Sequence, residues 1–340
     1  MAKVERNSCF ELLRICCMMM IIAGHIIMKH HAQFSLSNVD WTLDMLLRGA
    51  NAVAVNAFIL ISGYFGIHFK WERLMRMDMQ VVFYSVLLLL VSILLGWHTF
   101  NLQRDFLMFF PVLSKQYWFI TCYVVLYLIS PLLNRWSESM EKKEYKRILI
   151  VGAMIIYINF LVNANQFIND AGYGIVNFAY LYMLGRYIRN HYEDKRMAAY
   201  YWRGYFLTVL LLFACQYGLS WILGFEFTSW ISYNTIFVFV GAICLFMAFK
   251  NMTFTSRIVN YWAKPCLAVY LIHLHPCIWS GFCSAIGVSD YHGKEFLLMI
   301  FVLPILIYVA CASLEIVREK VMIRIEVRVI SVIRNHSHLS

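Results

Sequence analysis

Arg14 and His25 are the two residues of this sequence whose types and spacing most clearly predict chemistry, and both lie in one apolar segment. On an α-helix their eleven-residue offset is about three turns plus roughly 20°, so both side chains project from one face, roughly 16 Å apart. Ionisable groups within an apolar helix of bilayer length are costly and tend to mark function. We therefore expect an anion-binding guanidinium and a basic imidazole on one helix face.

The composition places these residues in a membrane. The chain is 61% hydrophobic and 14% charged, with a mean hydropathy of +0.65, which is unlike a soluble globular protein. Apolar stretches of about 18–22 residues, the length that crosses a bilayer, recur throughout. We expect an all-α integral membrane protein, a bundle of about ten transmembrane helices. The predicted spans are 9–28, 46–66, 78–97, 117–134, 148–166, 174–189, 205–225, 230–249, 266–287 and 296–316.

The spans follow one another too closely for a separate soluble domain. We predict a single transmembrane domain over residues 1–316 and a basic cytoplasmic C-terminal tail over residues 317–340. The first span carries Arg14 and lacks a small-residue cleavage site, so we do not interpret it as a signal peptide. The tail alternates basic and apolar residues, and it either lies on anionic membrane lipids of the inner leaflet or extends the last helix.

The positive charge follows the predicted topology. With the N-terminus inside, 23 of the 28 Lys and Arg residues other than Arg14 lie in inside segments and 5 lie outside. Such a bias across short loops indicates that both termini are cytoplasmic in a multi-pass cell-membrane protein. The net charge of +10 is therefore a topology signal, and we expect no nucleic-acid partner.

The cysteines and histidines give no metal motif. The ten cysteines include no C-x-x-C pair, and we expect them to be buried as small apolar residues. His273 and His275 are two residues apart, so a helix would point their rings in different directions, and no Cys or carboxylate accompanies them at useful spacing. The sequence predicts no metal site.

Other polar residues have two interpretations each. Arg73 and Arg76 share a helical face at the predicted inner surface, where guanidinium groups suit phosphate oxygens but also serve as positive-inside flanks. Tyr270 and His273 share a face in the ninth span, and His273 is either a structural or a functional residue. Glu315 offers a structural alternative for Arg14, which it would neutralise.

Two further segments are expected to be structural. Gly63 lets helices approach closely and Ser62 can hydrogen-bond within a bundle, whereas a nucleophilic Ser62 would need an adjacent base. The first outside loop, Lys29–Asp44, is expected to be a solvated loop, with a sugar-facing mouth as the alternative.

Taken together, these motifs resemble the acyltransferase-3 family of membrane acyltransferases over essentially the whole chain. The resemblance is carried by Arg14 and His25 (Arg-x10-His) in the first span, Ser62-Gly63, Arg73-x-x-Arg76, Trp118-Phe119 with Tyr127 and Pro131, and Tyr270 with His273. Glu11 stands where many family members have Asp.

The resemblance implies a membrane O-acyltransferase. Its donor would be acyl-coenzyme A, most commonly acetyl-CoA, entering from the cytoplasm with its phosphates held by Arg73, Arg76 and Arg14. His25 would act as general base on the acceptor, and Tyr270 or His273 would stabilise the tetrahedral intermediate. The acceptor would be a hydroxyl of a cell-surface polysaccharide or of a lipid-linked sugar precursor, at a bacterial cytoplasmic membrane.

The competing hypothesis is transport. A multispan transporter or flippase for a polysaccharide precursor would use internal Arg and His residues equally well. However, no pair of Gly- or Pro-broken spans occupies matching positions in two halves, which argues against an inverted-repeat transporter. A polysaccharide polymerase would usually bring a long outside loop, and the sequence contains none.

Overall fold

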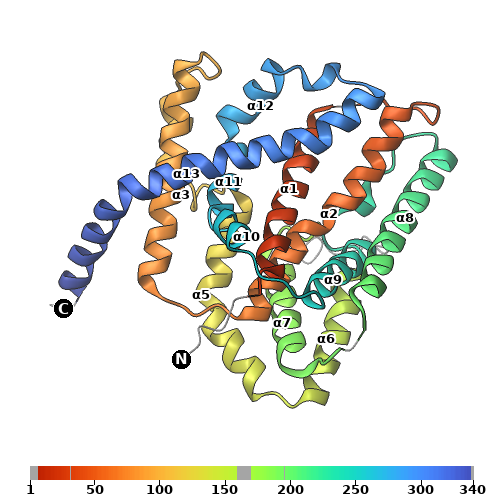
Figure 1. Cartoon of the computed structure of the whole chain (residues 1–340), viewed down its shortest axis with the longest axis horizontal. Coiled ribbons are helices and arrows are strands. Elements are labelled where there is room, and N and C mark those ends of the chain that lie inside the picture. Colours follow the sequence, from red (N-terminus) through yellow and green to blue (C-terminus); the bar gives the residue numbers. More distant parts are fainter. Residues whose placement is uncertain (1–6, 31, 159–169, 195, 338–340) are drawn as a thin grey trace.

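All regular secondary-structure elements in the described part of the chain are helices. The computed structural model describes residues 7–30, 32–158, 170–194 and 196–337, and these contain no strand (Figure 1). The all-α prediction is confirmed. The elements in chain order are α1 (Cys9–His30), α2 (Val39–Phe65), α3 (Trp71–Leu94), α4 (Leu102–Asp105), η1 (Phe106–Phe109), α5 (Trp118–Ser139), α6 (Lys142–Tyr157), α7 (Ile175–His191), α8 (Ala198–Leu223), η3 (Ser229–Ile231), α9 (Ile236–Lys250), α10 (Arg257–Trp262), α11 (Cys266–His273), α12 (Pro276–Ala285), η4 (Val288–Asp290) and α13 (Gly293–Ser337).

Among the described residues, seven helical segments are long and apolar enough to cross a membrane. They contain α1, α2, α3, α5, α8, α9 and α13, and the bent pair of α11 and α12 makes an eighth if it counts as one span. The multi-pass prediction is therefore confirmed, but not the count of ten. Helices α6 and α7 have 16 and 17 residues, short of the ~20 that a span needs. The remainder of the predicted fifth span, residues 159–166, lies outside the described residues.

The ninth predicted span is broken rather than straight. Helices α11 and α12 meet at an angle of 72°. Pro276 is the first residue of α12, where its missing N–H is tolerated, and the His275 side chain caps that helix by accepting from the Cys277 amide. The proline prevents one continuous helix, so α11 ends at His273, next to the candidate site.

Two predicted boundaries were wrong. Helix α1 continues to His30 and α2 begins at Val39, so half of the predicted loop Lys29–Asp44, at its two ends, is helical. The reason is that the Asn38 side chain accepts the Asp40 amide and starts α2 early. At the other end of the chain, α13 continues without a break to Ser337, so the tail extends the last helix.

Helix α2 is packed tightly against α7. A Cβ on Gly63 would lie 2.2 Å from the Tyr182 carbonyl oxygen, and one on Gly185 would lie 2.6 Å from the Leu60 carbonyl oxygen. Only glycine permits so close a backbone approach, as is common where membrane helices cross. The packing role predicted for Gly63 is confirmed.

Helix α1 lies between two buried apolar clusters. Its residues Leu13 and Cys17 belong to a cluster with α2, α5, α7, α8 and α9, while Ile22 and Ile26 belong to one with α3, α11 and α13. In Figure 1, α1 begins and α13 ends toward the lower side of the view, and α12 lies toward the upper side. Following the predicted topology, we call the lower side the inner end and the upper side the outer end.

A candidate active site along the first helix

A cavity of about 840 Å³ follows α1 along the seam between the two apolar clusters. Four of the predicted site residues, Arg14, His25, Arg73 and Tyr270, line it. Arg14 and His25 thus face the same space, as their shared helix face predicts. The cavity walls come from α1, α2, α3, α5 and α11, so residues far apart in sequence contribute to one site.

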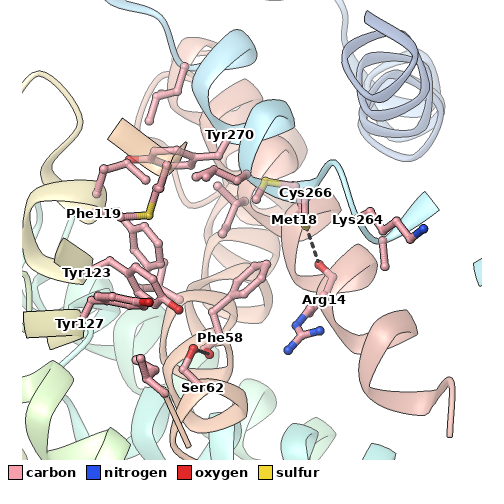
Figure 2. A pocket seen from close by; sticks show the side chains of 18 of the residues that line it. Arg14, Met18, Phe58, Ser62, Phe119, Tyr123, Tyr127, Lys264, Cys266 and Tyr270 are labelled. Atoms are coloured by element: carbon pink, nitrogen blue, oxygen red, sulfur yellow. Dashed lines mark hydrogen bonds between the residues drawn. The ribbon is translucent and has the colours of Figure 1, made fainter. Parts of the chain in front are cut away.

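The inner end of the cavity is basic. Arg14, His68, Arg73 and Lys264 all line it there, with Glu11 as the carboxylate among them. Figure 2 shows the Arg14 guanidinium pointing across open space toward the side formed by Ser62 and Tyr123. His68 and Lys264 were not predicted as site residues. In the sequence, Lys264 counted only toward the inside charge, because a lysine at the inner end of a membrane helix is ordinary positive-inside flanking.

Arg14 is held by a carboxylate one turn before it. One of its terminal nitrogens lies 2.9 and 2.8 Å from the two Glu11 carboxylate oxygens, and the Arg14 side chain remains 28% exposed. The proposed alternative partner, Glu315, instead accepts from Tyr84 at 2.6 Å and from Arg318 at 2.7 and 2.9 Å. The Glu315 alternative was therefore wrong, since other groups already satisfy that carboxylate.

Tyrosine and asparagine side chains fix the loop before α3, residues 66–70, through hydrogen bonds to its backbone. The Ile67 amide donates to the Tyr182 hydroxyl at 2.8 Å, the Asn134 side chain donates to the Ile67 carbonyl at 2.9 Å, and the Lys70 amide donates to the Tyr127 hydroxyl at 3.0 Å. This fixed loop sets where α3 starts and so where Arg73 enters the cavity.

Arg76 is placed differently from Arg73. It is absent from the cavity lining, and its Nε lies 3.9 Å from the carboxylate of Glu326 on α13. Glu326 in turn accepts a hydrogen bond from the buried Arg318. Of the two predicted phosphate-binding arginines, only Arg73 therefore faces the same space as Arg14.

His25 and His273 contact each other through their rings. His25 Nδ1 lies 3.1 Å from His273 Nε2, and His273 Nδ1 lies 2.7 Å from the Val269 carbonyl oxygen. A carbonyl only accepts, so His273 Nδ1 carries a proton. For two neutral rings, His273 Nε2 must then accept from His25 Nδ1–H. The lone pair of His25 is left on Nε2, on a ring that lines the cavity.

Tyr270 brings a hydroxyl to the same region. The side chain is 5% exposed, and its hydroxyl has no hydrogen bond of ordinary geometry in the described part of the chain. The Phe119 backbone amide lies near it, at the first turn of α5, where helix amides lack intrahelical partners. A buried donor without a well-formed partner costs free energy, so this hydroxyl is available to a bound ligand.

The outer end of the cavity is aromatic. Trp118, Tyr173 and Tyr233 line it, with ring centroids 4.5 Å apart for Trp118 and Tyr173 and 4.8 Å apart for Tyr173 and Tyr233. Trp118 carries part of the family resemblance, whereas the two tyrosines were not predicted as site residues. The available signal was that each lies at the start of a predicted outer-to-inner span, as Trp118 does, with Tyr173 one residue before its span and Tyr233 just inside its own.

Ser62 lines the cavity but makes a local backbone bond. Its hydroxyl donates to the Phe58 carbonyl one turn earlier, at 3.1 Å. Tyr123 and Tyr127 from α5 extend toward Phe58 and Ser62 in Figure 2. This hydrogen bond fits the predicted structural role, because a nucleophilic serine would need to give its proton to a base.

The sequence model of the family described as "Acyltransferase domain" matches residues 7–315. No curated protein matches the chain, and no solved structure does. The matched region contains the whole cavity lining and covers nearly the whole chain. This protein therefore belongs to the acyltransferase-3 family.

Proposed function

We propose that this protein is a membrane O-acyltransferase. It moves an acyl group, for which acetyl is our first candidate, from cytoplasmic acyl-coenzyme A to a sugar hydroxyl of a cell-surface polysaccharide or its lipid-linked precursor. The observation that carries the proposal is a continuous cavity that joins a basic inner end to His25 and to an aromatic outer end.

The two ends of the cavity suit the two substrates. Coenzyme A carries several phosphates on one side of a narrow, flexible pantetheine arm. Arg14 and Arg73, joined by Lys264, offer guanidinium and ammonium donors to those phosphates. The arm would extend along α1 toward His25, and Trp118, Tyr173 and Tyr233 would face the acceptor from the outer side.

The proposed chemistry uses His25 Nε2 as the general base. It takes the proton of the acceptor hydroxyl while the oxygen attacks the thioester carbonyl carbon. The Tyr270 hydroxyl donates to the developing oxyanion. The C–S bond then breaks, the ester remains on the acceptor, and the coenzyme A thiolate takes the proton back from His25. His273 does not touch the substrates in this mechanism but holds His25 in the required tautomer.

The family and the helices agree with a multi-pass membrane location, and we propose the cytoplasmic membrane of a bacterium with both termini inside. Membrane lipids would surround the exposed apolar faces of α3, α8 and α13. These faces carry large exposed side chains such as Leu94, Leu207 and Phe301.

The test is acyl-coenzyme A binding to purified protein by calorimetry, followed by acyl transfer to a model glycan. Wild type should bind acetyl-CoA, and Arg73→Ala should weaken binding. Arg73→Lys should restore only part of it, since lysine keeps the charge and loses the bidentate fork. Arg203→Ala is the matched control, because Arg203 is an exposed arginine on the same predicted side and outside the cavity lining.

The outcomes separate the enzyme from a carrier. Folded wild-type protein that binds no acyl-coenzyme A would support the transport alternative, because a flippase has no reason to bind that donor. If Arg73→Ala and Arg203→Ala weaken acetyl-CoA binding equally, only overall charge matters for binding. Arg73 would then contribute to membrane topology and not to a specific donor site. Arg76→Ala should have a smaller effect than Arg73→Ala, since Arg76 faces Glu326.

A further inference from the structure

A second cluster of chemically capable side chains lies at the outer end of α1, away from the cavity. His30 is the last residue of α1, Asp40 is in the first turn of α2, and His292 directly precedes α13. One nitrogen of each histidine and one Asp40 oxygen all lie within 4.8 Å of one another. The adjoining ends of α1 and α2 and the distant start of α13 therefore bring two imidazoles and a carboxylate together.

We propose that His30, Asp40 and His292 form a binding site for a divalent transition metal ion, with Zn²⁺ as the best match. Two imidazoles and one carboxylate are a borderline donor set that suits Zn²⁺, whereas Ca²⁺ and Mg²⁺ prefer oxygen ligands alone. Three protein ligands leave further coordination positions, and His292 is 70% exposed, so solvent reaches the site.

The surroundings of His30 support this assignment. His30 Nδ1 lies 3.1 Å from Asp44, whose side chain is 2% exposed, and the His30 ring stacks on Phe296 with centroids 4.0 Å apart. A carboxylate on the far ring nitrogen is the arrangement that orients metal-binding histidines and selects the coordinating nitrogen. It leaves His30 Nε2 free of Asp44 and next to the Tyr291 carbonyl oxygen, one residue before His292.

The proposed ligand atoms take part in hydrogen bonds in the structure. His30 Nε2 lies 2.8 Å from the Tyr291 carbonyl oxygen, and His292 Nδ1 lies 2.9 Å from an Asp40 oxygen. Metal binding would replace the Nε2 proton of His30 and any proton on the coordinating nitrogen of His292, releasing them to solvent. The other Asp40 oxygen would keep its hydrogen bond from the Gly293 amide at 2.7 Å.

The bound metal would fasten the outer ends of α1, α2 and α13. His25 lies on the last turns of α1, five residues before His30, so the site would also steady the helix end that carries the proposed base. This is a structural site, separate from acyl transfer, and its existence does not depend on the proposed enzymatic function.

The experiment uses full-length protein in detergent with a purification tag that contains no histidine. After chelator treatment, Zn²⁺ binding is measured by equilibrium dialysis and elemental analysis. Co²⁺ absorption then distinguishes nitrogen and oxygen ligands from thiolates, which matters in a chain with ten cysteines. The variants are His292→Ala and Asp40→Asn. His98→Gln is the control, since His98 is paired with Asp105 in another loop.

We expect stoichiometric binding at micromolar Zn²⁺ by wild type and His98→Gln, a nitrogen–oxygen Co²⁺ spectrum, and a Zn²⁺-dependent rise in melting temperature. Binding should be at least about tenfold weaker in both His292→Ala and Asp40→Asn. Failure of folded wild type to bind, a thiolate spectrum, or retention of full affinity in either variant would overturn the proposal.

Discussion

His25 and His273 form the contact on which the proposed chemistry depends. The Val269 carbonyl fixes the proton on His273 Nδ1, and the contact between the two rings then fixes the tautomer of His25. A histidine base needs such a partner, because only one ring nitrogen can carry the lone pair that takes the substrate proton. At the residue scale the structure thus supplies an orienting group that the sequence did not identify.

This contact gives graded predictions for positions 25 and 273. Because His25 is the proposed base, His25→Ala should lower the acyl-transfer rate by about 10²–10⁴-fold. His273→Asn can still donate to Val269 but is too short to reach His25, and it should lower kcat by up to about 10²-fold with little change in donor KM. His273→Gln places an acceptor near the position of Nε2 and should recover part of that loss. Steady-state kinetics with acetyl-CoA measures all three, and equal rates for Asn and Gln would contradict the tautomer argument.

Substitution of Tyr270 should affect catalysis and leave stability nearly unchanged. Tyr270→Phe removes a hydroxyl that lacks a well-formed partner, so the melting temperature should stay near that of wild type. If the hydroxyl stabilises the oxyanion, kcat should fall by about 10²–10³-fold. Thermal unfolding and kinetics on the same preparation check both expectations. An active Tyr270→Phe variant would remove Tyr270 from the mechanism.

At the scale of elements, the site is assembled by helices that approach unusually closely. The crossing of α2 and α7 at Gly63 and Gly185 brings Tyr182 beside the loop that precedes α3. That loop positions Arg73, so a packing contact on one side of α2 determines where a proposed donor-binding residue lies.

The crossing predicts an asymmetric response to alanine. Gly185→Ala places a Cβ 2.6 Å from the Leu60 carbonyl oxygen and 2.7 Å from the Tyr64 amide nitrogen, which are backbone atoms that cannot turn aside. It should destabilise the protein by about 1–3 kcal/mol. Gly218→Ala in α8 meets nothing within 4 Å and should be neutral or stabilising by up to ~1 kcal/mol. Thermal unfolding in detergent compares the two, and similar losses would argue against a tight crossing.

The connection between α7 and α8 gives a pH-dependent prediction. Burial would raise the pKa of Asp194, but hydrogen bonds from Tyr201, Asn251 and the Arg196 amide outweigh it, so the pKa is lowered overall. A lowered folded-state pKa stabilises the fold above the unfolded pKa of about 3.9, and this stability is lost as the pH falls through the folded value. Asp194→Asn should therefore lower the melting temperature at pH 7, with the difference shrinking below about pH 4. A difference independent of pH would indicate a purely steric effect.

At the scale of the whole molecule, the cavity runs along α1 between two apolar clusters, and its basic and aromatic ends face opposite ends of the bundle. This polarity gives the proposed reaction a direction, with the donor on one side of the membrane and the acceptor on the other. Which side of the membrane holds the donor depends on the orientation of the helices in the membrane.

The topology can be tested directly. A reporter active only in the cytoplasm should be active when fused after Ser340, and one active only outside should be active when inserted in the loop that ends at Asn38. The charge bias of 23 to 5 motivates both expectations. Fusions at Glu141 and Glu193 should also report the cytoplasm, whether or not α6 and α7 cross the membrane. An external signal at Ser340 would contradict the predicted orientation.

The sequence alone determined the membrane class, the helical fold and the family. Hydrophobic length and charge placement are properties of consecutive residues, so they survive without tertiary information. The face shared by Arg14 and His25 is likewise local, since helix geometry sets it. The early start of α2 and the break at Pro276 also have local signals, in Asn38 and in the proline itself.

Only the tertiary structure decided which residues meet. His25 contacts His273 across 248 positions of the chain, His30 approaches His292 across 262, and Arg73 enters the cavity while Arg76 turns to Glu326. Membrane helices pack through small residues and side-chain shape rather than through a strong sequence period, so pairing between distant helices leaves no pattern in one sequence. The partners of a catalytic or metal-binding side chain are therefore set by packing, whereas the helix that carries it is set by composition.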